Sequence, residues 1–169
     1  PDFRLDRTIL DTIEEKLKKI GVKIRKNIMI GKNITLDDMF RDDFDAVFIG
    51  TGVWRPKKLG IKGESLGNVH FAIDYLKTPK AYDLGKKVIV VGAGNVAMDV
   101  ARTAIRNGAH EVSIMYRKGE EDMPAERIEI EHAKIDGVKF NLFKSPLEFS
   151  ETGIKYENTK EDDNSIAFE

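Results

Sequence analysis

The stretch Lys86-Lys-Val-Ile-Val-Val-Gly-Ala-Gly-Asn-Val-Ala97 decides the fold of this chain. Its apolar, β-branched run Val88–Val91 is typical of a parallel strand that is covered on both faces. Gly92, Gly94 and Ala97 then have the spacing of a dinucleotide fingerprint. In that fingerprint the first glycine makes the tight turn and the second lets a pyrophosphate approach the backbone. The third small residue lets the helix pack close to the strand.

The residues after the glycines place this fingerprint in a larger unit. One apolar helical stripe has members at i, i+3, i+4, i+7 and i+8, namely Ala97, Val100, Ala101, Ala104 and Ile105. Asn107-Gly108 is a helix stop, and Val112–Tyr116 reads as a second strand. Strand, glycine turn, helix and strand together make a βαβ unit of about thirty residues. We predict a dinucleotide site here; the alternative is a glycine turn with a structural role only.

The charge at the end of the second strand indicates which dinucleotide is bound. A site selective for NAD places an acidic residue there to bond the ribose 2′-hydroxyl. This chain has Arg117 and Lys118 instead, which suit a 2′-phosphate because arginine can grip it with two parallel hydrogen bonds. The sequence favours NADP over NAD. The alternative is that the two cations only keep the end of a strand solvated. The acidic residues at 120–122 follow closely and make the sign of the local charge less distinct.

Composition excludes several classes of function. The chain has 169 residues, 41% of them hydrophobic, and a formal net charge of −1, so nothing points to nucleic acid or a membrane as a partner. Neither an apolar run of about eighteen residues nor a signal peptide is visible, and we expect a cytoplasmic protein. With no cysteine and three scattered histidines, we expect no disulfide, metal site or iron–sulfur cluster within the chain.

The ends and the middle of the sequence indicate part of a longer polypeptide with two domains. The sequence starts at Pro1 without a methionine and stops at Ile166–Glu169, which reads as a strand just starting. Thr78–Gly85 is the candidate domain boundary.

The first 82 residues contain less regular patterns. Helices are predicted over Thr8–Ile20, from the capping box Thr35–Asp38 and over Phe71–Lys77. Short strand-like pieces are Val22–Arg25 and Ile28–Ile30. Ala46–Ile49 reads as a buried strand, after which Gly50-Thr51-Gly52 forms a turn whose main-chain groups can contact a ligand. An ordinary exit from strand to loop is the alternative.

Beyond the second strand, the pattern continues as an α/β fold. A helix is predicted over Ala125–Asp136 and a third strand over Val138–Phe143, so the order βαβαβ extends a Rossmann-like, doubly wound parallel sheet. Leu147–Phe149 and Ile154–Tyr156 are predicted to form an antiparallel hairpin. Glu157–Ser165 is polar and is expected to be a loop.

Several further motifs are spread over nearly the whole chain. They are Pro1-Asp-Phe-Arg-Leu5, Phe44–Gly52, Trp54-Arg-Pro56, Gly63-Glu64, Val90-Val-Gly-Ala-Gly-Asn-Val-Ala-Met-Asp99, Tyr116-Arg-Lys118 and Met123-Pro-Ala125. Together, and in matching order, they resemble the motifs of the glutamate synthase small-subunit family, which includes NADPH-dependent ferredoxin reductase subunits and dihydropyrimidine dehydrogenase.

The resemblance implies two nucleotide-binding domains, with an NADPH domain inserted into an FAD domain. Residues 1–82 would be a partial FAD-binding domain segment, with Thr51 and Gly52 at the flavin. Residues 83–169 would be a Rossmann-like NAD(P)H-binding domain, truncated at its C-terminal end. Arg117 would bind the 2′-phosphate, with Lys118 where relatives often have a second arginine. The residues implied at the pyrophosphate are Gly92, Gly94, Asn95, Val96 and Ala97.

The implied activity is that of an NADPH-dependent FAD oxidoreductase. A hydride would pass from NADPH to FAD, and electrons would pass onward to iron–sulfur clusters outside this chain. The partner would be a large catalytic or electron-accepting subunit or domain. No catalytic acid or base is expected, because the cofactors carry the chemistry. We expect the chain alone to hold no FAD and to be inactive, since the first glycine motif of an FAD domain is absent.

Two other classes use a similar glycine turn. A non-catalytic dinucleotide-sensing Rossmann domain would share the βαβ unit, but it would not explain residues 1–82. A methyltransferase would place an acidic residue on the ribose at the end of the second strand, where this chain has Arg117.

Overall fold

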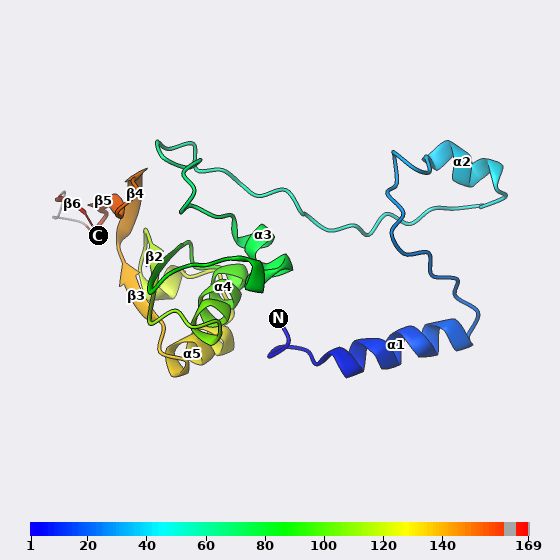
Figure 1. Cartoon of the computed structure of the whole chain (residues 1–169), viewed down its shortest axis with the longest axis horizontal. Coiled ribbons are helices and arrows are strands. Elements are labelled where there is room, and N and C mark those ends of the chain that lie inside the picture. Colours follow the sequence, from blue (N-terminus) through cyan, green and yellow to red (C-terminus); the bar gives the residue numbers. More distant parts are fainter. Residues whose placement is uncertain (161–164, 169) are drawn as a thin grey trace. The chain divides into compact units, whose positions relative to one another are not determined.

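The computed structural model describes residues 1–160 and 165–168 (Figure 1). The chain divides into two compact units, Pro1–Val53 and Trp54–Glu169. Within the described residues, no helix has the length and apolar composition needed to span a membrane.

The first unit contains two helices that begin at capping residues. Helix α1 (Arg7–Lys19) starts after Asp6, whose carboxylate accepts the N–H of Thr8 at 2.8 Å. Helix α2 (Leu36–Arg41) has the predicted capping box: Asp38 N–H donates to Thr35 Oγ1 at 3.1 Å, and Thr35 N–H donates to Asp38 Oδ2 at 2.9 Å. Each cap satisfies backbone donors that the first helical turn leaves open. Both predicted helices are confirmed.

The strands predicted in the first unit are wrong. Val22–Arg25 and Ala46–Ile49 lie in irregular backbone, and Ile30 forms only a single bridge with Ile34. Phe48 is 95% exposed. A strand needs a neighbouring strand for its N–H and C=O groups and a half-buried surface for its side chains. The described part of this unit supplies neither, so β-branched composition alone does not form a strand.

The second unit is built on a parallel sheet of β1 (Lys87–Val91), β2 (Glu111–Tyr116) and β3 (Lys139–Leu142), in the order β1-β2-β3. Helices α4 (Asn95–Arg106) and α5 (Arg127–Ile135) connect the strands. The predicted βαβαβ order and the Rossmann-like α/β class are therefore confirmed.

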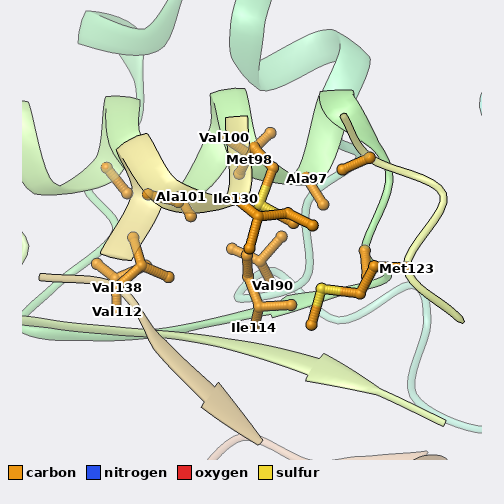
Figure 2. Close-up of a cluster of buried hydrophobic side chains, with 14 of the residues drawn as sticks. Val90, Ala97, Met98, Val100, Ala101, Val112, Ile114, Met123, Ile130 and Val138 are labelled. Carbon is orange, nitrogen blue, oxygen red and sulfur yellow. The ribbon is translucent and has the colours of Figure 1, made fainter. Parts of the chain in front are cut away.

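One face of this sheet packs on the two helices. Figure 2 shows Met98 of α4 and Ile130 of α5 beside Val90 and Ile114 of the sheet. Met98 and Ile114 are both 0% exposed. This cluster is the main core of the chain, and it includes the apolar stripe that the spacing from Ala97 onward predicts.

An antiparallel sheet covers the other face, where a doubly wound sheet would carry helices. It consists of β4 (Lys144–Phe149), β5 (Ile154–Asn158) and β6 (Ile166–Phe168). Met115 of β2 packs here against Ile154 and Tyr156. The predicted hairpin and final strand are confirmed. Of the predicted loop Glu157–Ser165, the first two residues belong to β5, and 161–164 lie outside the described residues.

Residues 54–86 pack on these layers. Helix α3 (Ala72–Lys77), which confirms the predicted short helix, is followed by the 3₁₀ turn η1 (Pro79–Ala81). Phe149 N–H donates to Lys62 O at 2.9 Å, so this segment runs beside β4. Next to it, a Cβ on Gly63 would lie 2.1 Å from Phe149 O, so only glycine fits. The predicted domain boundary at residues 82 and 83 stays a prediction.

An ion cluster joins α4 to the end of α5. Asp136 Oδ2 lies 2.7 Å from Arg102 Nε and 2.5 Å from Arg106 Nη1, and Arg102 Nη1 lies 3.2 Å from Glu129 Oε2. The hydrogen bond from Arg106, followed by that from Arg102, holds the pKa of Asp136 below its usual 3.8. Because that pKa is lowered on folding, the ionised carboxylate stabilises the fold above about pH 4. This stabilisation is lost as the pH falls through the lowered pKa.

Asp136→Asn should therefore lower the free energy of unfolding at pH 7 by about 2–3 kcal/mol, since it removes the carboxylate that Arg102 and Arg106 share. Arg102 keeps Glu129 as a neighbouring carboxylate. The difference from the wild type should shrink below about pH 4. Urea unfolding at pH 7 and pH 3 measures both effects. Glu131→Gln, which removes an exposed charge from the same helix, should change stability by less than about 0.5 kcal/mol. An equal loss for Asp136→Asn at the two pH values would contradict the assignment.

Candidate functional site

The glycine turn after β1 leaves backbone open to a ligand. Gly92 has φ +111°, a conformation that favours glycine, and its N–H donates to Met115 O of β2 at 2.9 Å. A Cβ on Gly92 would meet no heavy atom within 4 Å, and one on Gly94 would meet only Pro124 Cγ at 4.0 Å. The chain itself therefore does not fill the space over either glycine. A pyrophosphate can approach the backbone there.

Helix α4 starts at this turn without a side-chain cap. Its N-cap is Gly94, whose carbonyl accepts the N–H groups of Ala97 at 2.9 Å and Met98 at 3.2 Å. In the part of the chain that the structure describes, no acceptor faces the N–H groups of Asn95 and Val96. Open donors and the positive end of the helix dipole together suit an anion.

A strap of four residues, Met123–Glu126, lies against the glycine turn. Ala125 N–H donates to Ala93 O at 3.1 Å, and Glu126 N–H donates to Asn95 Oδ1 at 2.9 Å. The side chain of Asn95 therefore holds the strap at the start of α4. Sequence analysis missed this role, because residues 31 positions apart form the bond and no local pattern marks it.

The two predicted cations follow β2 and are exposed. Their backbone is held from the side of the antiparallel sheet. The hydroxyl of Thr159 donates to Arg117 O, and Phe143 N–H donates to Lys118 O at 3.3 Å. A Cβ on the next residue, Gly119, would lie 3.1 Å from Phe143 Cζ, so the ring of Phe143 lies close against the backbone there. Sequence analysis missed the positioning by Thr159 and Phe143, which lie far along the chain.

The side chains of the two cations differ in their surroundings. Lys118 Nζ lies 3.5 Å from Asp122 Oδ1. Among the ion pairs within residues 1–160 and 165–168, none involves Arg117. The guanidinium of Arg117 is therefore available to an anionic ligand.

The glycine turn and the cations lie at the same edge of the sheet. Val91 pairs with Met115 in the parallel register of β1 and β2. Both strands end at that edge, so Gly92 and Arg117 lie beyond neighbouring strand ends. Ligands of open α/β sheets bind at this carboxyl edge.

Thr51 and Gly52, the predicted flavin contacts, belong to the first unit. Gly52 has φ +70° in irregular backbone, and the neighbouring Val53 is 90% exposed. Thr51 and Gly52 are themselves exposed. Their contact with a flavin stays a prediction.

The parallel sheet and its connecting helices define a Rossmann-like α/β fold, and the open glycine turn and the exposed cation beyond β2 lie where proteins of this class bind their ligands. The sequence profile of the family described as pyridine nucleotide-disulphide oxidoreductase matches residues 12–169. The chain belongs to this family.

Curated relatives confirm the expected resemblance to the glutamate synthase small-subunit family. The chain is 41% identical over 153 residues to the NADP(+)-dependent formate dehydrogenase subunit beta of Moorella thermoacetica, covering 86% of this chain and 21% of that protein. It is 32% identical over 161 residues to the glutamate synthase [NADPH] small chain of Escherichia coli (strain K12), covering 87% and 34%. The chain thus spans about a fifth to a third of these relatives.

Two solved structures share the fold. A 2-naphthoyl-CoA reductase complex superposes with a TM-score of 0.73 at 18% identity, covering 92% of this chain and 22% of that one. FprA of Mycobacterium tuberculosis in complex with NADPH superposes with a TM-score of 0.67 at 17% identity, covering 100% and 55%. At these identities the likeness concerns the fold alone, and it supports the Rossmann-like class.

The close packing at Ala97 can be tested by substitution. Ala97 is 8% exposed and lies in the core at the first turn of α4. A leucine there should displace the helix start, lowering stability by about 1–3 kcal/mol and abolishing dinucleotide binding. Ala104→Leu is the matched control, because Ala104 is 1% exposed on the same helix but lies near its far end.

The control should lose stability and keep binding wherever it is folded. Urea unfolding and titration with NADPH give the two measurements. If Ala97→Leu binds NADPH normally, the glycine fingerprint has a structural role only.

Proposed function

We propose that this chain is the NADPH-binding portion of a flavin-dependent oxidoreductase. In the whole protein, a hydride passes from NADPH to FAD and electrons continue to iron–sulfur centres outside the chain. One observation supports NADPH binding most directly. The exposed Arg117, which has no ion pair within the described residues, lies at the same sheet edge as an open glycine turn. Membership of the pyridine nucleotide-disulphide oxidoreductase family supports the reaction class.

The start of α4 holds the pyrophosphate in this proposal. The N–H groups of Asn95 and Val96 donate to its oxygens, and Gly92 and Gly94 let it reach the backbone. The small side chain of Ala97 keeps α4 close to the sheet, which maintains the direction of those donors. None of these contacts depends on whether the ribose carries a 2′-phosphate, so they serve NADPH and NADH alike.

Arg117 makes the choice between the two nucleotides. Its planar guanidinium can donate two parallel hydrogen bonds to the 2′-phosphate. Lys118 adds a second positive charge, although its ammonium already faces Asp122 at 3.5 Å. An unmodified 2′-hydroxyl offers no charge to either cation, so NADH gains little from them.

Hydride transfer to FAD is inferred from family membership and not from the geometry of this chain. The chemistry supplied by the bound cofactors is hydride transfer from the reduced nicotinamide to the flavin, which demands no acid or base from the protein. Thr51 and Gly52 are proposed to contact the flavin in the whole protein. The names of the relatives, a formate dehydrogenase subunit and a glutamate synthase small chain, support a larger electron-accepting partner.

Arg117→Ala tests the proposal. Hydrogen bonds to charged groups contribute about 1.5–3 kcal/mol, so the variant should bind NADPH about tenfold or more weakly and NADH unchanged. Titration of both nucleotides against the wild type and the variant measures the effect. Lys139→Ala removes one positive charge from the opposite edge of the sheet, where Lys139 pairs with Glu111, and it should change neither affinity. Equal losses of NADPH and NADH binding by Arg117→Ala would defeat the assignment.

A further inference from the structure

An acidic 3₁₀ turn, η2 (Glu120–Asp122), directly follows the cations of the candidate site. Each of its carboxylates faces a different cation. Glu120 lies 2.6 Å from Lys134, Glu121 lies 3.5 Å from Arg127, and Asp122 lies 3.5 Å from Lys118. The last pair joins the turn to a cation that the proposed function assigns to the nucleotide.

The backbone of Asp122 is held in place by groups other than its own carboxylate. Its carbonyl accepts the hydroxyl of Tyr116 at 2.8 Å, and its N–H donates to Gly119 O at 3.2 Å. The next residue, Met123, is 8% exposed and packs in the core. Replacing the carboxylate therefore leaves the turn's anchors intact, and only the charge beside Lys118 changes.

We propose that Asp122 is a specificity-determining residue, whose carboxylate competes with the 2′-phosphate of NADPH for the ammonium of Lys118. This inference rests on the proposed function. A bound 2′-phosphate must draw Lys118 away from Asp122. NADH does not meet this cost, because its ribose carries no phosphate there. Asp122 therefore narrows the difference in affinity between the two nucleotides, and Arg117 carries most of the preference that remains.

The exposure of the pair sets the size of the effect. The side chains of Lys118 and Asp122 are both 53% exposed, and exposed ion pairs alter equilibria by up to about fivefold. Salt screens such pairs, so the effect is largest at low ionic strength.

Asp122→Asn is the test, because asparagine keeps the shape of the side chain and removes its charge. At low ionic strength the variant should bind NADPH about two- to fivefold more tightly and NADH unchanged, and the gain should shrink at high salt. In a Lys118→Gln background most of the gain in NADPH affinity should disappear, because there is then no ammonium for which Asp122 and the 2′-phosphate can compete. A gain that persists in full in that background would overturn the inference.

Glu121→Gln is the matched control. It removes the same charge one position away, where the partner is Arg127, and it should leave the ratio of the two affinities nearly unchanged. An equal gain from Glu121→Gln would assign the effect to net charge and would also overturn the inference.

Arg117→Ala, titrated in parallel, distinguishes a failure of the proposed function from a failure of the role of Asp122. Equal loss of NADPH and NADH binding in that variant would defeat the proposed function. Selective loss of NADPH binding, combined with an unchanged ratio for Asp122→Asn, would defeat only the role of Asp122.

Discussion

The parallel pairing of β1 with β2 is the constraint on which the candidate site depends. Val91 lies opposite Met115, and the pairing ends with the bond from Gly92 N–H to Met115 O at 2.9 Å. Because parallel strands end at the same edge, this register brings the glycine turn and Arg117 beyond neighbouring strand ends. A slip of one residue would turn Met115 away from the antiparallel sheet and towards the helices. Both cores and the site would then be lost together.

The two layers that cover the sheet serve the site in different ways. Helix α4 leaves the N–H groups of Asn95 and Val96 open, and the side chain of Asn95 bonds Glu126 in the strap that precedes α5. The antiparallel sheet buries the opposite face through residues such as Ile154. The same layer holds the cations, because Thr159 and Phe143 bond the backbone carbonyls of residues 117 and 118. The packing of this layer therefore both buries one face of the parallel sheet and positions the backbone of residues 117 and 118.

Charge around the site is distributed so that one cation stands apart. The turn after β2 places a carboxylate beside each of Lys118, Arg127 and Lys134. Arg117 takes part in none of the ion pairs within the described residues, and it is the side chain best suited to a dianionic phosphate.

The first unit is less regular than the second. Its described part has no strand and leaves a large aromatic side chain such as Phe48 almost fully exposed.

The sequence by itself determined the parts of this protein that depend on near neighbours. Val88–Val91, the glycine spacing, the helical stripe and Arg117 were readable because periodicity and turn chemistry act over a few residues. Tertiary structure decided the rest: that Asn95 bonds a residue 31 positions away and that Thr159 bonds one 42 positions away. It also decided that Ala46–Ile49 forms no strand, because an apolar run becomes a strand only where a partner strand supplies hydrogen bonds and a surface to bury it.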